Sequence, residues 1–169
     1  MVQWKGMPIL IDGHNLIGQL PGIDLADPDD EARLVMVLRR YAARRRGRKI
    51  VVIFDGGVYG HPGNLNGYGV EAHFVRMPAN ADSELIRRIR GIRRCSEWLV
   101  VSSDRAVAGA AQAHGVPVLS AQAFARRLAA LDQPKASIQA KRNDRPLSAA
   151  EVEEWLRLFG LEADDEEGP

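Results

Sequence analysis

The stretch PILIDGHNLIG, residues 8–18, sets the first constraint on the fold. Its apolar run at 9–11 is short and continuous, which is typical of a strand buried on both faces of a parallel sheet. The run ends at Asp12, and Asn15 follows three residues later. A carboxylate and a carboxamide directly after a buried strand indicate a polar site at the carboxyl end of that strand.

Four further apolar runs predict the rest of the sheet: IVVIF, VEAHFV, WLVVS and VPVL, at residues 50–54, 70–75, 98–102 and 116–119. The run VEAHFV alternates in polarity, which predicts an edge strand. Helical patterns lie between the runs, at residues 29–46, 82–94, 104–114 and 121–131. The sequence therefore predicts an α/β fold, a doubly wound and mainly parallel sheet of about five strands with helices on both faces.

The chain divides into four parts by composition. Residues 1–132 are expected to form the folded domain, and residues 133–147, with few large apolar side chains, a linker. A capping box opens the segment 148–160, and apolar residues at i, i+3, i+4 and i+7 follow, which predicts an amphipathic C-terminal helix. This helix would dock on its own domain or on another protein. Residues 161–169 form an acidic tail.

The net charge of +1 combines a basic part and an acidic end. Residues 1–150 carry a net charge of +8 and residues 151–169 a net charge of −7. Such asymmetry is typical of proteins with a nucleic-acid partner. No apolar stretch approaches a bilayer span, the first residues leave no room for a signal peptide, and the single Cys95 fits a reducing compartment. We therefore expect a cytoplasmic protein with no membrane partner.

Each of the first four predicted strands leads to an aspartate, in chain order Asp12, Asp55, Asp82 and Asp104. Because the carboxyl ends of parallel strands share one edge of a sheet, the four should lie on one rim. Taken singly, Asp82 and Asp104 could interact with helix N-termini, and Asp55 could form a turn. Clustered carboxylates raise one another's pKa, so such a site usually holds a divalent cation.

The donor types indicate Mg²⁺ or Mn²⁺ as the cation. Oxygen ligands argue against zinc, and the four His residues are scattered. Asn15 could orient a phosphate or a water, and Gly13 would allow a sharp turn and a close approach of substrate. Ser103 could bind a carboxylate or a phosphate, or cap a helix. One cation and two cations both remain open.

Four short motifs, DGHN, FDG, ADS and SSD, occur in this order at residues 12–15, 54–56, 81–83 and 102–104. In this arrangement they resemble the NYN domain family, a PIN-like nuclease group, and its YacP-like branch most closely. The resemblance covers about residues 7–131 and implies a metal-dependent endoribonuclease that acts in RNA processing or turnover.

The resemblance also implies roles for individual residues. Asp12, Asp82 and Asp104 would be catalytic metal ligands. Asn15 would be their polar partner and Asp55 a supporting carboxylate. His14 stands at a position where the family varies, and we assign it no role beyond a substrate contact. A non-catalytic RNA-binding module on the same fold is the alternative function.

Two arginine-rich segments, 39–49 and 87–94, are candidate phosphate contacts. The glycine-rich segment 56–69 could be a lid whose tyrosines stack on unpaired bases, or a plain surface loop. The predicted RNA-binding residues are Ser103, Arg44, Arg45, Arg87, Arg88, Arg90, Tyr59 and Tyr68. The expected partner is RNA in single-stranded form, with the ribosome or translation-linked RNA as one source.

Other phosphate-handling α/β proteins do not fit these motifs. A haloacid-dehalogenase-type phosphotransferase needs a second aspartate two positions after the first, and position 14 is a histidine. A receiver domain needs a paired acid and a later lysine, neither of which is evident. No Walker loop and no GxGxxG follow the first strand.

Overall fold

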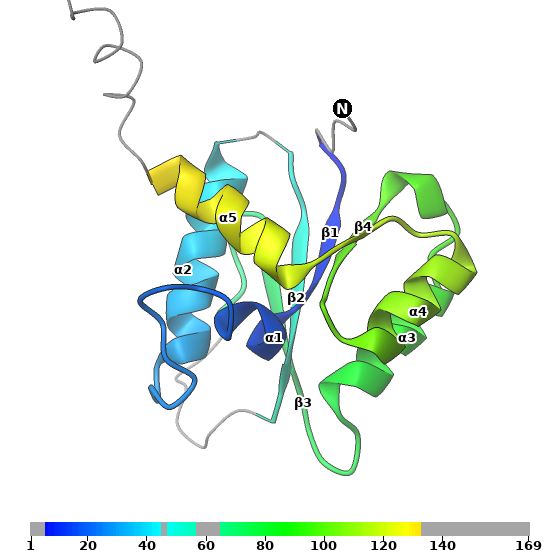
Figure 1. Cartoon of the computed structure of the whole chain (residues 1–169), viewed down its shortest axis with the longest axis horizontal. Coiled ribbons are helices and arrows are strands. Elements are labelled where there is room, and N and C mark those ends of the chain that lie inside the picture. Colours follow the sequence, from blue (N-terminus) through cyan, green and yellow to red (C-terminus); the bar gives the residue numbers. More distant parts are fainter. Residues whose placement is uncertain (1–5, 45–46, 57–64, 133–169) are drawn as a thin grey trace, which may run out of the picture. The chain divides into compact units, whose positions relative to one another are not determined.

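The computed structural model describes residues 6–44, 47–56 and 65–132. Within them, five parallel strands form one sheet in the order β3-β2-β1-β4-β5 (Figure 1). The strands are β1 Ile9–Asp12, β2 Ile50–Asp55, β3 Val70–Val75, β4 Leu99–Val101 and β5 Val118–Leu119. The predicted parallel, doubly wound sheet is confirmed. The alternating strand β3 lies at an edge of the sheet, as its pattern indicates.

Helices cover both faces of the sheet. They are α1 Gly13–Ile17, α2 Asp30–Ala43, α3 Ala81–Arg90, α4 Arg105–His114 and α5 Ala121–Asp132, with a 3₁₀ turn at Cys95–Glu97. Figure 1 shows α1, α2 and α5 on one face and α3 and α4 on the other. The sequence patterns predict the longer helices but not α1, because five residues are too few to show a helical repeat. None of the described helices combines the length and apolarity that a membrane span needs.

Each face of the sheet has its own hydrophobic core. Successive side chains of a strand point to opposite faces, so a fully apolar strand such as β1 contributes to both cores. On one face Ile11 belongs to a cluster with Leu38 of α2 and Phe124 of α5. On the other face Leu10 belongs to a cluster with Leu85 of α3. All five side chains are at most 2% exposed.

The strand order places a binding edge between β1 and β4. The chain builds β1, β2 and β3 in one direction and then returns to the other side of β1 to add β4. Ile11 pairs in register with Val101, so Asp12 and Ser102 leave the sheet side by side. In open parallel sheets, ligands bind beyond the carboxyl ends of the strands at such a reversal.

Some sequence predictions lie outside the described residues and stay predictions. They are the linker at 133–147, the amphipathic helix at 148–160, the acidic tail at 161–169, and the RNA contacts Arg45 and Tyr59.

Candidate active site

Asp12 is the buried acid of the carboxyl edge, with 6% of its surface exposed. The hydroxyl of Ser102 donates a hydrogen bond to its Oδ2 at 3.1 Å. Burial raises the pKa of Asp12 to about 6, and the charges of Asp82 and Asp104 act in the same direction, against the hydrogen bond from Ser102. The ionised form of Asp12 is therefore disfavoured, and a cation at this edge would relieve the cost.

The other three aspartates come to the same edge from different elements. Burial raises the pKa of Asp82, in the first turn of α3, and the charges of Asp104 and then Asp55 raise it further. The backbone N–H of Ala81 donates to Asp55 Oδ1 at 2.6 Å, which ties the end of β2 to the start of α3. Asp12, Asp82 and Asp104 thus act on one another electrostatically, and Asp55 acts on Asp82 from the same rim.

Asp104 also stabilises the helix that follows it. Its Oδ1 accepts hydrogen bonds from the backbone N–H groups of Ala106 at 2.8 Å and Val107 at 3.1 Å, so Asp104 is the N-cap of α4. Both of these bonds use the same carboxylate oxygen. The capping interpretation is therefore correct, and it leaves Oδ2 outside the cap.

Asn15 is oriented by the connection from β4 to α4. The backbone N–H of Ser103 donates to Asn15 Oδ1 at 2.8 Å. The hydroxyl of Ser103 accepts from the backbone N–H of Ala121 at 2.9 Å and donates to Oε1 of Gln122 at 3.2 Å. Ser103 thus links the acidic rim to the start of α5.

Gly13 owes its identity to packing. A Cβ at this position would lie 2.4 Å from two ring carbons of Phe54 and 2.9 Å from the carbonyl oxygen of Ile53. Gly13 is buried and begins α1. The glycine therefore allows α1 to pack closely on β2, which differs from the sharp turn and substrate approach predicted from the sequence.

His14 points to the start of α2. Its Nε2 lies 3.2 Å from Glu31 Oε1, and its ring contacts Phe54 edge-on with 5.4 Å between centroids. The candidate ligand atoms of His14, Asp30 and Glu31 all lie within 4.8 Å of one another, so among the described residues these three form a group that could hold a metal ion. Burial, followed by the hydrogen bond and charge of Glu31, raises the pKa of Asp30 to about 6.

Sequence reasoning does not identify Ser102, Glu31 or Gln122. Ser102 could have been found, because it continues the alternation of β4 one residue beyond its last apolar position. Glu31 follows another acid in the first turn of α2, where acids are common for electrostatic reasons alone. Gln122 carries no local signal, since its relation to the rim depends on where α5 begins in space.

Two of the predicted RNA contacts lie far from the acids. Arg44 follows the last residue of α2, and Tyr68 precedes β3, so both lie toward the amino ends of the strands. Tyr68 is 83% exposed, and the guanidinium carbon of Arg39 lies 5.4 Å from the centre of its ring. The structure therefore does not bring these two residues to the acidic rim.

The arginines of α3 also lie away from its acidic end. Arg87, Arg88 and Arg90 belong to the last turns of α3, and a helix rises about 1.5 Å per residue from Asp82. Two of them form ion pairs within the helix: Oε1 of Glu84 lies 2.7 Å from Nη2 of Arg87 and 2.6 Å from Nε of Arg88.

Two other exposed arginines directly follow a strand or an acid of the carboxyl edge. Arg76 directly follows β3, and Arg105 directly follows Asp104. Both therefore lie at the carboxyl ends of strands, on the side of the acidic rim.

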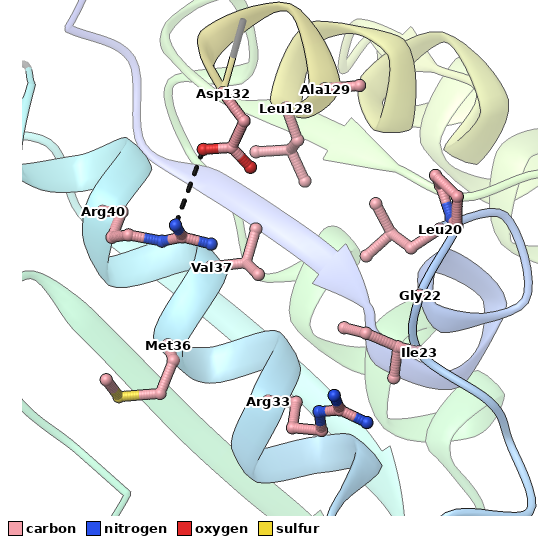
Figure 2. A pocket seen from close by; sticks show the side chains of 11 residues that line it. Leu20, Gly22, Ile23, Arg33, Met36, Val37, Arg40, Leu128, Ala129 and Asp132 are labelled. Carbon is pink, nitrogen blue, oxygen red and sulfur yellow. Dashed lines mark ion pairs between the residues drawn. The ribbon is translucent and has the colours of Figure 1, made fainter.

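A groove of about 680 Å³ lies between α2, α5 and the segment around Ile23 (Figure 2). Its lining is largely apolar, with Arg33 and Arg40 as its basic members, and Arg40 pairs with Asp132 at 3.6 Å. None of the four rim aspartates lines this groove. The hollow is therefore separate from the acidic site.

The fold and the site define an α/β protein with an acidic centre at the reversal point of a parallel sheet. Residues 9–159 match the family of the YacP-like NYN domain, and the chain belongs to this family. The family resemblance seen in the sequence motifs is thus confirmed.

Two solved structures share the fold. They are crystal structures of Rae1 (YacP) from Bacillus subtilis, one of them a point mutant, both 21% identical to this chain. The TM-scores are 0.61, with 90% of this chain and 91% of Rae1 covered, and 0.60 for the mutant, with 89% and 91% covered. Curated protein sequences gave no significant match.

Proposed function

We propose that this chain is a divalent-metal-dependent endoribonuclease that hydrolyses RNA phosphodiester bonds in RNA processing or turnover. The observation that carries the proposal is the mutual effect of the rim carboxylates. Burial is the largest cause of the raised pKa of Asp12, and the charges of Asp82 and Asp104 raise this pKa further. Acids gathered at this cost at the binding edge of a parallel sheet are a candidate functional site.

The donor type of the rim residues suits a hard divalent cation. Their donors are carboxylate oxygens, which Mg²⁺ and Mn²⁺ prefer, and the direct ligands would be Asp12, Asp82 and Asp104. A bound cation would stabilise the negative charge of the phosphodiester during displacement. We assign the cation to the rim and not to the group around His14, because the rim carries four carboxylates at the edge where the strand order reverses.

The chain's own residues would orient the substrate. The amide oxygen of Asn15 is held by Ser103, so its NH₂ group is directed away from that bond and can donate to the RNA. Asp55 would hold the start of α3, and with it Asp82, through its bond to Ala81. We further propose single-stranded RNA in the cytoplasm as the substrate, with ribosome-bound or translation-linked RNA as one source.

The second candidate function is a non-catalytic RNA-binding module. The bonds that Asp55 and Asp104 make to helix N-termini favour it, because they give both acids a structural purpose without catalysis. The burial of Asp12 argues for the enzyme, because the backbone N–H of Asn15 and the hydroxyl of Ser102 offset only part of the cost of burying this carboxylate, and its pKa stays raised.

Divalent-dependent cleavage separates the two candidates. The purified chain should cleave an end-labelled single-stranded RNA in Mg²⁺ or Mn²⁺, and EDTA should stop the reaction. Asp82→Asn should abolish cleavage with little change in thermal stability, because the residue is exposed. Asp132→Asn is the matched control, since it removes an equal charge at the far end of α5. Equal cleavage by wild type and Asp82→Asn would reject the site.

A further inference from the structure

Ser103 holds two side-chain amides at the same time. Its backbone N–H donates to Asn15 Oδ1 at 2.8 Å, and its hydroxyl donates to Gln122 Oε1 at 3.2 Å. A backbone N–H can only donate, which fixes the orientation of Asn15. The hydroxyl oxygen already accepts from the N–H of Ala121 at 2.9 Å, and its proton is used for Gln122.

Both amides therefore turn an oxygen to Ser103 and direct their NH₂ donors away from it, toward a ligand. With their oxygens bound to Ser103, Asn15 and Gln122 keep two N–H donors each, on the NH₂ groups. Gln122 is exposed in the first turn of α5, just after β5 ends at the carboxyl edge. Asn15 lies three residues after the buried acid of the same edge. The pair thus borders the proposed reaction site.

The chemistry of the pair selects its ligand. A group that contacts only donors must itself be an acceptor, and the non-bridging oxygens of a phosphodiester are acceptors only. Base edges in contrast mix donors and acceptors. The donors are also neutral, so they can hold a phosphate beside the carboxylates without pairing with those carboxylates as an arginine would.

We propose that Gln122 and Asn15 form a neutral clamp that binds an RNA phosphate beside the acidic rim, with Ser103 as the residue that positions both amides. The inference rests on the proposed function, and it adds Gln122 as a substrate-binding residue. It also changes the role of Ser103 from an RNA contact to a positioning residue, because its hydroxyl is already bonded on both sides.

Substitutions of Gln122 test the clamp in the full chain carrying Asp82→Asn, which prevents cleavage. Gln122→Glu keeps an oxygen for Ser103 but replaces the NH₂ donors by a charged oxygen. Gln122→Ala removes both groups. Gln112→Glu makes the same change at an exposed position near the carboxyl end of α4, away from the acidic rim, and is the matched control. The measurement is fluorescence anisotropy with oligo-U and oligo-A RNA across a range of salt concentrations.

We expect Gln122→Ala to weaken binding about 10-fold, as for one lost hydrogen bond to a charged group. Gln122→Glu should weaken it further, because a carboxylate then faces the phosphate. The loss should be equal for oligo-U and oligo-A. The salt slope of Gln122→Ala should match that of the parent chain, since a neutral amide releases no counterions. Gln112→Glu should bind like the parent.

Cleavage by the otherwise wild-type chain gives a second readout. Gln122→Ala should raise KM while kcat stays within about 2-fold, as for loss of uniform binding. Ser103→Ala should show part of the same rise in KM, because Gln122 then loses its partner.

Three results would overturn the inference. Unchanged affinity and KM in both Gln122 variants, with RNA binding intact in the parent, would reject the clamp and leave the proposed function standing. A loss confined to one homopolymer would mean a base contact in place of a phosphate contact. Absence of RNA binding by the parent chain itself would overturn the proposed function together with the clamp.

Discussion

In the absence of a cation, the buried carboxylate of Asp12 lowers the stability of the native state. Its carboxyl group is buried and lies near two further acids, and these effects outweigh its hydrogen bonds to Ser102 and to the backbone N–H of Asn15, so its pKa rises from 3.8 to about 6. An acidic group whose pKa is higher in the native state than in the unfolded chain lowers the stability of the native state. The loss accumulates over the pH range in which the unfolded chain is ionised and the native group is not. The cost begins as pH rises through 3.8 and is complete above about 6.

We predict that Asp12→Asn stabilises the metal-free protein at neutral pH. The difference in free energy of unfolding between variant and wild type should be near zero at pH 3.5, grow between pH 4 and 6, and level off near about 2–3 kcal/mol. Denaturant unfolding in EDTA across this pH range measures it. A variant that is less stable than wild type at pH 7.5 would contradict the burial argument. The same substitution should abolish cleavage.

Ser102 should act through Asp12. Ser102→Ala removes the hydrogen bond that favours the ionised carboxylate, so we predict weaker cation binding by about 10- to 100-fold. The measurement is the Mg²⁺ concentration that gives half-maximal cleavage. Ser102→Thr keeps the hydroxyl and should restore most of the affinity. If Ala and Thr variants need the same Mg²⁺ concentration as wild type, Ser102 has no positioning role.

Helix α3 carries acidic residues in its first turn and basic residues in its last turn. Asp82 lies in the first turn, and Arg87, Arg88 and Arg90 lie in the last turns. Hydrogen bonds from Arg87 and then Arg88 lower the pKa of Glu84 to about 2. Exposed pairs of this kind contribute little to stability. Replacing the contact between these arginines and Glu84 by a contact with a phosphate would therefore cost little folding free energy.

We predict that replacing Arg87, Arg88 and Arg90 by Gln weakens RNA binding and flattens its salt dependence. Each phosphate contact on a single strand contributes about −0.7 to the slope of log affinity against log salt. Anisotropy titrations at several salt concentrations measure both effects. If affinity and slope stay unchanged, the RNA path lies elsewhere, and Arg105 beside the rim becomes the next residue to replace.

The distribution of charge over the whole chain leads to a prediction about its acidic end. Deleting residues 161–169 removes five acidic groups from a chain with a net charge of +1. We expect RNA affinity to change less than about 2-fold at physiological salt, because exposed charges beyond a Debye length are screened. A marked rise in affinity at low salt would instead show that this segment competes with RNA for the basic surface.

The sheet and the order of its acids could be predicted from the amino-acid sequence alone. Continuous apolar runs indicate burial on both faces, the alternating run at 70–75 indicates the edge, and each aspartate directly follows or ends a predicted strand or begins a predicted helix. Because parallel strands share one direction, the carboxyl edge follows from the chain order without any contact being known. The common rim of Asp12, Asp55, Asp82 and Asp104 could therefore be predicted.

The three-dimensional contacts were needed to show which further side chains contact the acidic rim and which predicted ones lie away from it. Ser102 reaches Asp12 across 90 residues, and His14 turns to Glu31 across 17, because the strand order places β4 beside β1 and α2 beside α1. Tyr68 lies at the opposite edge from the acids, since a connection between parallel strands must return to the amino end. Local sequence patterns indicate which residues are buried and whether a segment is helix or strand. Contacts between residues far apart in the chain depend on which helices and strands become neighbours in space.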